Sequence, residues 1–314
     1  MHSSLTLALS AILAAAVFPA ATAQFNSDPV IREPSAPNIK IRDDDGSLRA
    51  GLRCGVKQRT PLQRDVLERN LREFRKQSPF AALAESHGSI TIPVWFHIVT
   101  KTSKGKNPTL VGNVTDAQIA DQLAVLNDAY AGRGFSFTHG GTTRTNNGRW
   151  FDGCARYSTE TTMKAALAVD PAHNLNFYSC KPGDYLGYAY YPDSFDENDT
   201  RHGVVVLHSS FPDGATTNYN EGDTGNHEVG HYLGLAHTFE GGCAEPGDSV
   251  ADTPAEESPA FGCPVGRDTC PSAGVDPIYN FMDYTYDSCM NTFTSGQDAR
   301  MEEIVALYKP SLGH

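Results

Sequence analysis

The stretch "NHEVGHYLGLAH", Asn226 to His237, places three histidines and one glutamate within twelve residues. Residues four apart on an α-helix share one face, so His227 and His231 are expected to point in the same direction. Two imidazoles arranged in this way can bind one Zn²⁺, with Glu228 beside them as a base that is not a ligand. The spacing therefore predicts a zinc-binding helix.

His237 can join this pair only if the chain leaves the helix. Six further helical residues would carry it about 9 Å along the helix axis. Gly234 lies between His231 and His237, and glycine adopts positive φ without a steric penalty. We therefore expect the helix to end at Gly234 and His237 to become the third metal ligand.

Two alternatives compete with this interpretation. A downstream glutamate could replace His237 as the third ligand, but Glu256 and Glu257 lie between Pro254 and Pro259, where a ligand-bearing helix is disfavoured. The chain could also be a catalytically inactive, secreted zinc-binding module. The presence of the base Glu228 beside the ligands favours an enzyme.

A second motif, "NFMDY", places Met282 in a short turn with Tyr284 two residues later. With "HEVGHYLGLAHTF" and "NFMDYTYDSCMNTFTSGQ", the sequence resembles the metzincin zinc peptidases, and within them the pappalysin-type branch and secreted fungal extracellular metalloproteases. The resemblance spans roughly Ser89 to Tyr308. It implies a methionine turn beneath the zinc site and a tyrosine near the metal that can donate a hydrogen bond to an oxyanion.

The fold and the function follow from the same resemblance and from the segment pattern. We expect an α+β, metzincin-like catalytic domain: a twisted mixed sheet, an active-site helix and an irregular, disulfide-tied C-terminal subdomain. The expected activity is that of a secreted zinc endopeptidase that acts on protein or peptide substrates as a monomer. Glu228 would be the general base for a zinc-bound water.

The N-terminus predicts export. An apolar run from Leu5 to Phe18 precedes Ala21-Thr22-Ala23, a signal for cleavage, and the run is too short to span a bilayer of about 30 Å. We therefore predict a signal peptide over 1–23, a pro-segment over 24–88 and a catalytic domain over 89–314, with no membrane anchor.

Charge separates the last two segments. Between Gln24 and Ile90 there are 12 basic and 9 acidic residues, whereas the other 13 basic and 28 acidic residues give −15 and bring the total to −12. A strongly acidic domain repels phosphate, so we expect no nucleic-acid partner.

Six of the seven cysteines lie in the acidic part, and an oxidising compartment permits three disulfides in 15 possible connectivities. The family resemblance implies the pairs Cys263 with Cys289 and Cys243 with Cys270, which leaves Cys154 with Cys180.

Cys54, in "LRCGVKQ", is then the odd cysteine, and it lies in the predicted pro-segment. A thiolate is a strong zinc ligand, so Cys54 could close the metal site and keep the enzyme latent. Related pro-segments use a similar Arg-Cys-Gly element, and Gly55 would let the backbone pass close to the metal.

Three weaker features complete the site predictions. Oxygen ligands in an irregular loop suggest a structural Ca²⁺, and the family resemblance points to the same region. Some members of the family that the sequence resembles cleave before arginine with an acidic residue near the cysteine that follows the methionine turn, where this sequence has Asp287, so the resemblance implies broad cleavage with at best a mild preference for basic residues. Two segments match the N-glycosylation acceptor. The calcium candidates are Asp248, Asp252, Thr253 and Glu256, and the glycosylation candidates are Asn113 and Asn198.

Hydrophobic periodicity predicts most of the regular elements. Helices are expected from Thr60 to Gln77, with an apolar stripe of Leu62, Val66, Leu71 and Phe74, from Thr115 to Tyr130, and from Gln297 to Leu307. Strands are expected at 90–98, 134–141, 174–180 and 203–211. Residues 24–51 lack periodicity and are predicted to be poorly ordered.

Overall fold

The computed structural model describes residues 39–43, 45–77 and 89–314. The predicted signal peptide, residues 1–23, lies outside the described residues. Within the described part of the chain, no helix combines the length and the apolar character needed to cross a bilayer.

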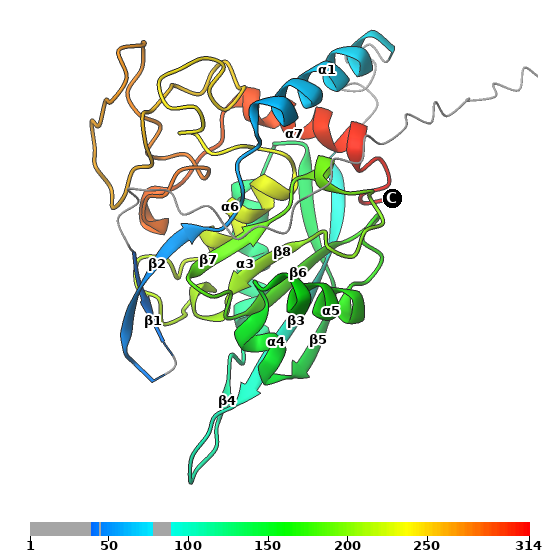
Figure 1. Ribbon diagram of the computed structural model, residues 1–314, viewed down its shortest axis with the longest axis vertical. Helices are drawn as coiled ribbons and strands as arrows, with labels where there is room; N and C mark the ends of the chain where they lie inside the picture. The colour runs from blue at the N-terminus through cyan, green and yellow to red at the C-terminus, as the bar shows by residue number, and fades with distance from the viewer. Residues whose placement is uncertain (1–38, 44, 78–88) are drawn as a thin grey trace, which may run out of the picture.

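A twisted mixed sheet forms the centre of the molecule (Figure 1), with strand order β1-β2-β7-β8-β6-β3-β4, and β5 also pairs with β3. Neighbouring strands are parallel at β2/β7, β8/β6, β6/β3 and β3/β5, and antiparallel at β1/β2, β7/β8 and β3/β4. The strands are β1 (Ile39–Arg42), β2 (Leu48–Cys54), β3 (Ile90–Thr102), β4 (Leu110–Val111), β5 (Phe135–Asn146), β6 (Leu175–Cys180), β7 (Tyr185–Ala189) and β8 (Val204–Leu207).

Helices pack on both faces of this sheet. Helices α3 (Asp116–Ala129) and α6 (Asp223–Tyr232) cover one face, and α4 (Gly148–Gly153) and α5 (Tyr157–Leu167) cover the other. Alternate residues therefore enter different cores: Val204 and Val206 pack on the α3/α6 side and Val205 on the α4/α5 side. Burial on both faces explains why β8, with the sequence VVVL, is apolar throughout.

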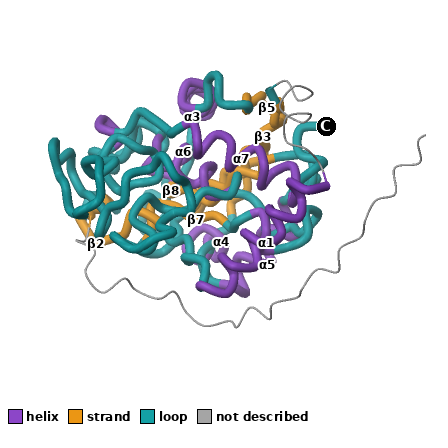
Figure 2. The backbone as a smooth tube through the Cα atoms, turned by 90° about the horizontal axis from the view of Figure 1, so that it is seen from above, coloured by secondary structure: helices purple, strands orange, loops and turns teal. Residues whose placement is uncertain are grey.

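Helix α1 (Pro61–Gln77) and the C-terminal helix α7 (Ser295–Tyr308) lie side by side above the sheet (Figures 1 and 2). Capping boxes begin α3 and α7, where Thr115 and Thr294 pair with a glutamine three residues later, and Thr60 and Gln63 make the same reciprocal bonds before α1. The helices predicted around residues 60–77, 115–130 and 297–307 are all present.

Three sequence predictions need correction. Residues 39–42 and 48–54 form the hairpin β1–β2 although the region was predicted to be poorly ordered, because β2 gains backbone hydrogen bonds from β7 that no local pattern reveals. Leu62 on α1 is 72% exposed, and the helix instead packs through Leu67 and Leu71 against Ile304. Strand β7 and helix α4 were not predicted because both are short, and helix α5 was not predicted because its buried side chains include Thr159, Glu160 and Lys164, which form no apolar stripe.

Residues 233–286, between α6 and the short 3₁₀ helix Asp287–Cys289, contain no helix or strand, as the density of glycine and proline predicts. The structure has three disulfides, Cys154–Cys180, Cys243–Cys270 and Cys263–Cys289, which is the pairing that the family resemblance implies. Two of these bridges tie the irregular region together.

Candidate metal centre

Helix α6 ends in a Schellman motif that turns the chain back toward the cluster. Gly234 has φ of 113°; its N–H donates to the His231 carbonyl at 3.0 Å, and the Leu235 N–H donates to the Gly230 carbonyl at 2.9 Å. This is the helix end predicted from the glycine. It returns His237 to the face that carries His227 and His231.

The three imidazoles converge on one point. The Nε2 atom of His231 lies 3.1 Å from Nε2 of His227 and 3.0 Å from Nε2 of His237. The Nδ1 atoms of His227 and His231 lie 2.7 Å from the carbonyls of Phe281 and Leu235, and a carbonyl can only accept, so both Nδ1 atoms carry the proton. The two Nε2 lone pairs therefore face each other, which is unfavourable unless a cation binds between them.

This geometry fits zinc. Zn–N bonds of about 2.0–2.1 Å in a tetrahedral site place neighbouring nitrogens a little over 3 Å apart, near the distances observed here. Burial lowers the pKa of all three histidines, to about 3 for His231, so they are in the neutral form that binds metal. His227, His231 and His237 can therefore hold the ion.

Tyr284 also reaches the cluster. Its hydroxyl lies 3.2 Å from Nε2 of His237, and its ring packs edge-on against the His237 ring, with centroids 5.0 Å apart. The Phe239 ring stacks on the His237 ring, with centroids 4.7 Å apart. The aromatic neighbours fix the plane of His237, whose Nδ1 has no hydrogen-bond partner among the described residues.

Met282 packs directly beneath α6. A Cβ added at Gly230 would collide with the Met282 sulfur, so the helix can lie on the methionine only because residue 230 has no side chain. Met282 is fully buried, and its carbonyl accepts from the N–H of Thr238, next to His237. The methionine turn thus supports both the helix and the returning loop.

Glu228 is fully buried beside the cluster, close to the backbone of β7. A Cβ added at Gly187 would lie 2.7 Å from Glu228 Cγ, so glycine is required at this position of β7. Burial raises the pKa of Glu228 to about 8. Its Oε2 atom accepts from the thiol of Cys54 over 3.6 Å.

Cys54 joins the histidines. One donor atom each from Cys54, His227, His231 and His237 lies within 4.8 Å of the others, and this is the one such metal-binding group found among the described residues. It includes neither Glu256 nor Glu257, so neither replaces His237. Cys54 is also the single cysteine outside the disulfides.

The hairpin β1–β2 brings Cys54 there by pairing with the edge of the sheet. β2 runs parallel to β7 in the register Cys54↔Gly187, and the Gly55 N–H donates to the Gly187 carbonyl at 2.9 Å. A Cβ at Gly55 would lie 2.9 Å from the Tyr185 ring, so a glycine is needed for this close approach.

Asp287 is buried and does not lie at a free surface. Its Oδ1 atom is 3.0 Å from the Arg53 guanidinium, and both side chains are fully buried. The same guanidinium donates to the Thr224 hydroxyl at 3.1 Å and lies 4.9 Å from the centre of the Tyr219 ring. The Arg53 side chain thus fills a buried pocket that is lined by the Asp287 carboxylate.

The structure does not bring the four calcium candidates together. Asp252 accepts from Thr294 and Gly296 at the start of α7, whereas Glu256 accepts from Thr238 and pairs with Arg267. Asp248 is buried, and its Oδ2 atom has no partner within the described part of the chain. Asn113 and Asn198 are exposed.

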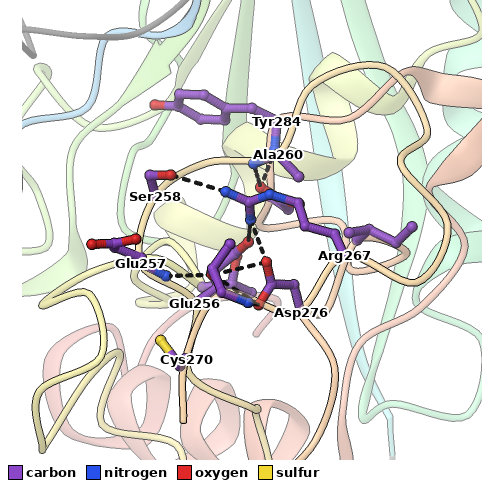
Figure 3. A network of polar contacts seen from close by, with 12 residues as sticks. Glu256, Glu257, Ser258, Ala260, Arg267, Cys270, Asp276 and Tyr284 are labelled. Carbon is purple, nitrogen blue, oxygen red and sulfur yellow. Dashed lines mark hydrogen bonds and ion pairs between the residues drawn. The ribbon is translucent and has the colours of Figure 1, made fainter.

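A buried ionic network supports the loop behind His237 (Figure 3). Arg267 pairs with Glu256 at 2.9 Å and with Asp276 at 2.5 Å, and Glu256 accepts from the Thr238 hydroxyl at 2.6 Å. Burial and the Asp283 carboxylate raise the pKa of Glu256 to about 9. Several acids therefore depend on one guanidinium.

Replacing Arg267 with glutamine is expected to lower the free energy of unfolding by about 3–5 kcal/mol, because buried carboxylates lose their cation. The raised pKa of Glu256 determines how the free energy of unfolding changes with pH. A carboxyl whose folded pKa exceeds its ordinary value of 4.5 stabilises the fold most at low pH and less as pH rises toward 9. Arg267 holds the pKa of Glu256 and of Asp283 below the value that burial alone would give, so its removal raises both pKa values further. The loss should therefore be larger at pH 8 than at pH 5 in chemical denaturation.

The control for this variant is Arg149→Gln, since Arg149 is exposed. It should change stability by less than about 0.5 kcal/mol at either pH. An Arg267→Gln protein as stable as the parent at pH 8 would contradict the role given to the network.

Several residues of this site were not predicted from the sequence. Gly187 and Gly230 matter only through the partners that the fold places against them. Arg267 is distant in sequence from the three histidines and carries no motif, and the contact of Thr238 with Glu256 cannot be read from its position next to His237. For Gly230, the position between Val229 and His231 on a helix is a weak signal, because a glycine inside a helix costs about 1 kcal/mol and calls for a packing reason.

Comparisons with known proteins agree with this arrangement. A family model described as "Pregnancy-associated plasma protein-A", Peptidase M43, matches residues 166–306. An extracellular metalloprotease of Podospora anserina is 45% identical over 245 residues, which are 73% of this chain and 82% of the relative. Extracellular metalloprotease 1 of Coccidioides posadasii is 44% identical, covering 71% of this chain and 79% of that protein.

Two solved structures are similar as well. Mature mirolysin of Tannerella forsythia, in complex with a cleaved peptide, aligns with a TM-score of 0.59 and 31% identity over 68% of this chain and 90% of its own. A promirolysin mutant from the same organism aligns with a TM-score of 0.62 and 28% identity over 82% of this chain and 95% of its own.

Proposed function

The chain belongs to the pregnancy-associated plasma protein-A family of zinc metalloendopeptidases, and from this premise we propose that Glu228 is its general base in peptide-bond hydrolysis. The observation that carries the proposal is the convergence of three neutral imidazoles beside a buried carboxylate. When bound, zinc supplies Lewis acidity that polarises a peptide carbonyl and acidifies water.

Two side chains act on the substrate. Glu228 accepts the proton of the attacking water and delivers it to the leaving amine, a role for which a raised pKa is suited. Tyr284 donates its hydroxyl proton in a hydrogen bond to the developing oxyanion, because its hydroxyl lies at the rim of the cluster. Water is excluded from the rest of the site by Met282 and the buried face of α6.

The test of this function is digestion of casein by the processed enzyme with and without a zinc chelator. Chelation should abolish digestion, and added Zn²⁺ should restore it. His237→Ala should lower both the bound zinc and the activity, because one of three ligands is lost. An unchanged zinc stoichiometry in His237→Ala would show that another residue is the third ligand.

We also propose that residues 24–88 form a pro-segment that keeps residues 89–314 latent through Cys54. The thiolate would occupy the position that the attacking water needs, and β2 would cover the edge of β7 that a substrate strand requires. The larger share of this chain that aligns with promirolysin than with mature mirolysin supports this division.

The substrate preference follows from Asp287. Once the pro-segment leaves, the pocket of Arg53 has a buried carboxylate without its cation, and Asp223 adds a second acidic group that interacts with Asp287 and Arg53. We therefore propose a preference for basic residues at the cleaved bond that is stronger than the mild preference expected from the sequence.

A peptide library measures this preference. Arginine next to the scissile bond should raise kcat/KM over glutamine by at least about tenfold, since a hydrogen bond to a charged group contributes about 1.5–3 kcal/mol. Strict selectivity for acidic residues or proline would contradict the proposal.

The remaining predictions concern export and modification. The names of the relatives support secretion of this chain as well. We propose that it is a secreted monomer, glycosylated at Asn113 or Asn198. A structural Ca²⁺ near Asp248 stays a prediction, which melting temperatures with and without a calcium-selective chelator would test.

A further inference from the structure

A second arginine of the N-terminal segment is bound on the other side of the metal cluster. Arg53 lies near Thr224 in the first turn of α6, whereas Arg59 donates to the carbonyl of Gly234, just beyond its last turn. These two positions on α6 are about 15 Å apart at 1.5 Å per residue. Cys54 and the histidines lie between them.

The site of Arg59 has the chemistry of an arginine-binding pocket. Its guanidinium makes two bonds to the Asp193 carboxylate, Nη2 to Oδ1 at 2.5 Å and Nε to Oδ2 at 3.2 Å. It lies 3.6 Å from the centre of the Tyr191 ring and donates to the Gly234 carbonyl at 3.3 Å. A bidentate carboxylate, an aromatic face and a carbonyl together favour the planar arginine side chain.

The walls of this pocket belong to the predicted catalytic domain and to its metal site. The ring of Tyr191 packs edge-on against His231, with centroids 5.7 Å apart. Behind it, Glu240 is 1% exposed, and its Oε2 atom has no hydrogen-bond partner among the described residues. The other oxygen of Glu240 pairs with Arg64, at 3.3 Å, which also belongs to the N-terminal segment.

Removal of the N-terminal segment therefore takes Arg59 and Arg64 away from Asp193 and Glu240. Two carboxylates then lie next to an aromatic ring without their arginines, and a cation is the ligand that such a group binds. An extended chain reaches about 20 Å over six residues, so a strand that passes the metal can contact both ends of α6.

We propose that Tyr191, Asp193 and the Gly234 carbonyl form a second substrate subsite that binds an arginine side chain, at the end of the cleft opposite Asp287. This inference rests on the proposed peptidase function and on the pro-segment boundary. The preferred substrates are peptides that carry one basic residue at the cleaved bond and another several residues away. In the latent protein Arg59 occupies this subsite.

The experiment uses the full chain, activated by removal of the pro-segment, and peptides with arginine at the cleaved bond. A further arginine is placed at each of the six positions on either side of the bond in turn and compared with citrulline, which has nearly the same shape without the charge. The measurement is kcat/KM for each pair in the parent, in Asp193→Asn and in Asp196→Asn. Asp196 is an exposed residue three positions from Asp193 and serves as the control.

We expect the parent and Asp196→Asn to prefer arginine over citrulline about tenfold at one position, and Asp193→Asn to reduce that ratio below about twofold. Cleavage of the citrulline peptide should be the same in the parent and in Asp196→Asn. The second subsite would be overturned if the parent cleaved the arginine and citrulline peptides equally well at every position, or if Asp193→Asn kept the preference for arginine. Either result would leave the peptidase function intact. A parent that hydrolyses none of the peptides would overturn the peptidase function and the subsite with it.

Discussion

The Glu228→Ala variant is expected to bind zinc as the parent does and to lose at least about 10²-fold in kcat/KM after activation. Glu228 is buried beside the three imidazoles but is not among the four residues whose donor atoms converge. Alanine removes the proton acceptor and leaves His227, His231 and His237 with their carbonyl and aromatic contacts.

The measurement combines zinc content by atomic emission with peptide hydrolysis. Glu257→Ala is the control, because Glu257 is exposed and was the rival candidate for a metal ligand; it should keep both zinc and activity. Loss of zinc in Glu228→Ala would mean that this carboxylate is a ligand or a structural support. Full activity in that variant would require another base.

The second large effect is expected in the unprocessed chain, where Cys54→Ser should turn an inactive protein into an active one. A hydroxyl binds zinc far more weakly than a thiolate, so the position that the attacking water needs becomes accessible. Burial and the Glu228 carboxylate raise the pKa of the thiol, so its ionised form at this place depends on a cation nearby.

Peptide hydrolysis by the intact chain, with its length checked before and after the assay, measures this effect. Leu48→Ser is the matched control, since Leu48 lies on the same strand and is 55% exposed. It should stay inactive. Cys54→Ser could instead be as inactive as the parent, with activity appearing only after cleavage. That result would show that the segment covering β7 closes the site sterically and that ligation by the Cys54 sulfur does not.

The sequence by itself determined the local part of this protein. A spacing of four residues placed His227 and His231 on one helical face, and Gly234 marked where that helix ends, because both properties depend on backbone geometry over a few residues. Threonine three residues before a glutamine marked the starts of two helices, at Thr60 and Thr115, for the same reason. The convergence of the three histidines could therefore be predicted without knowledge of the fold.

Only the tertiary structure decided which distant groups meet. The hairpin β1–β2 forms because β7 offers a free edge, and no pattern within residues 39–54 encodes that partner. The pairing of Arg53 with Asp287 and of Arg59 with Asp193 spans well over a hundred residues, and the contacts of Gly187 and Gly230 exist only once the sheet and the methionine turn are packed. Ion pairs, aromatic contacts and the close approach that a glycine permits all act over a few ångströms. Their partners are therefore fixed by packing and not by spacing in the sequence.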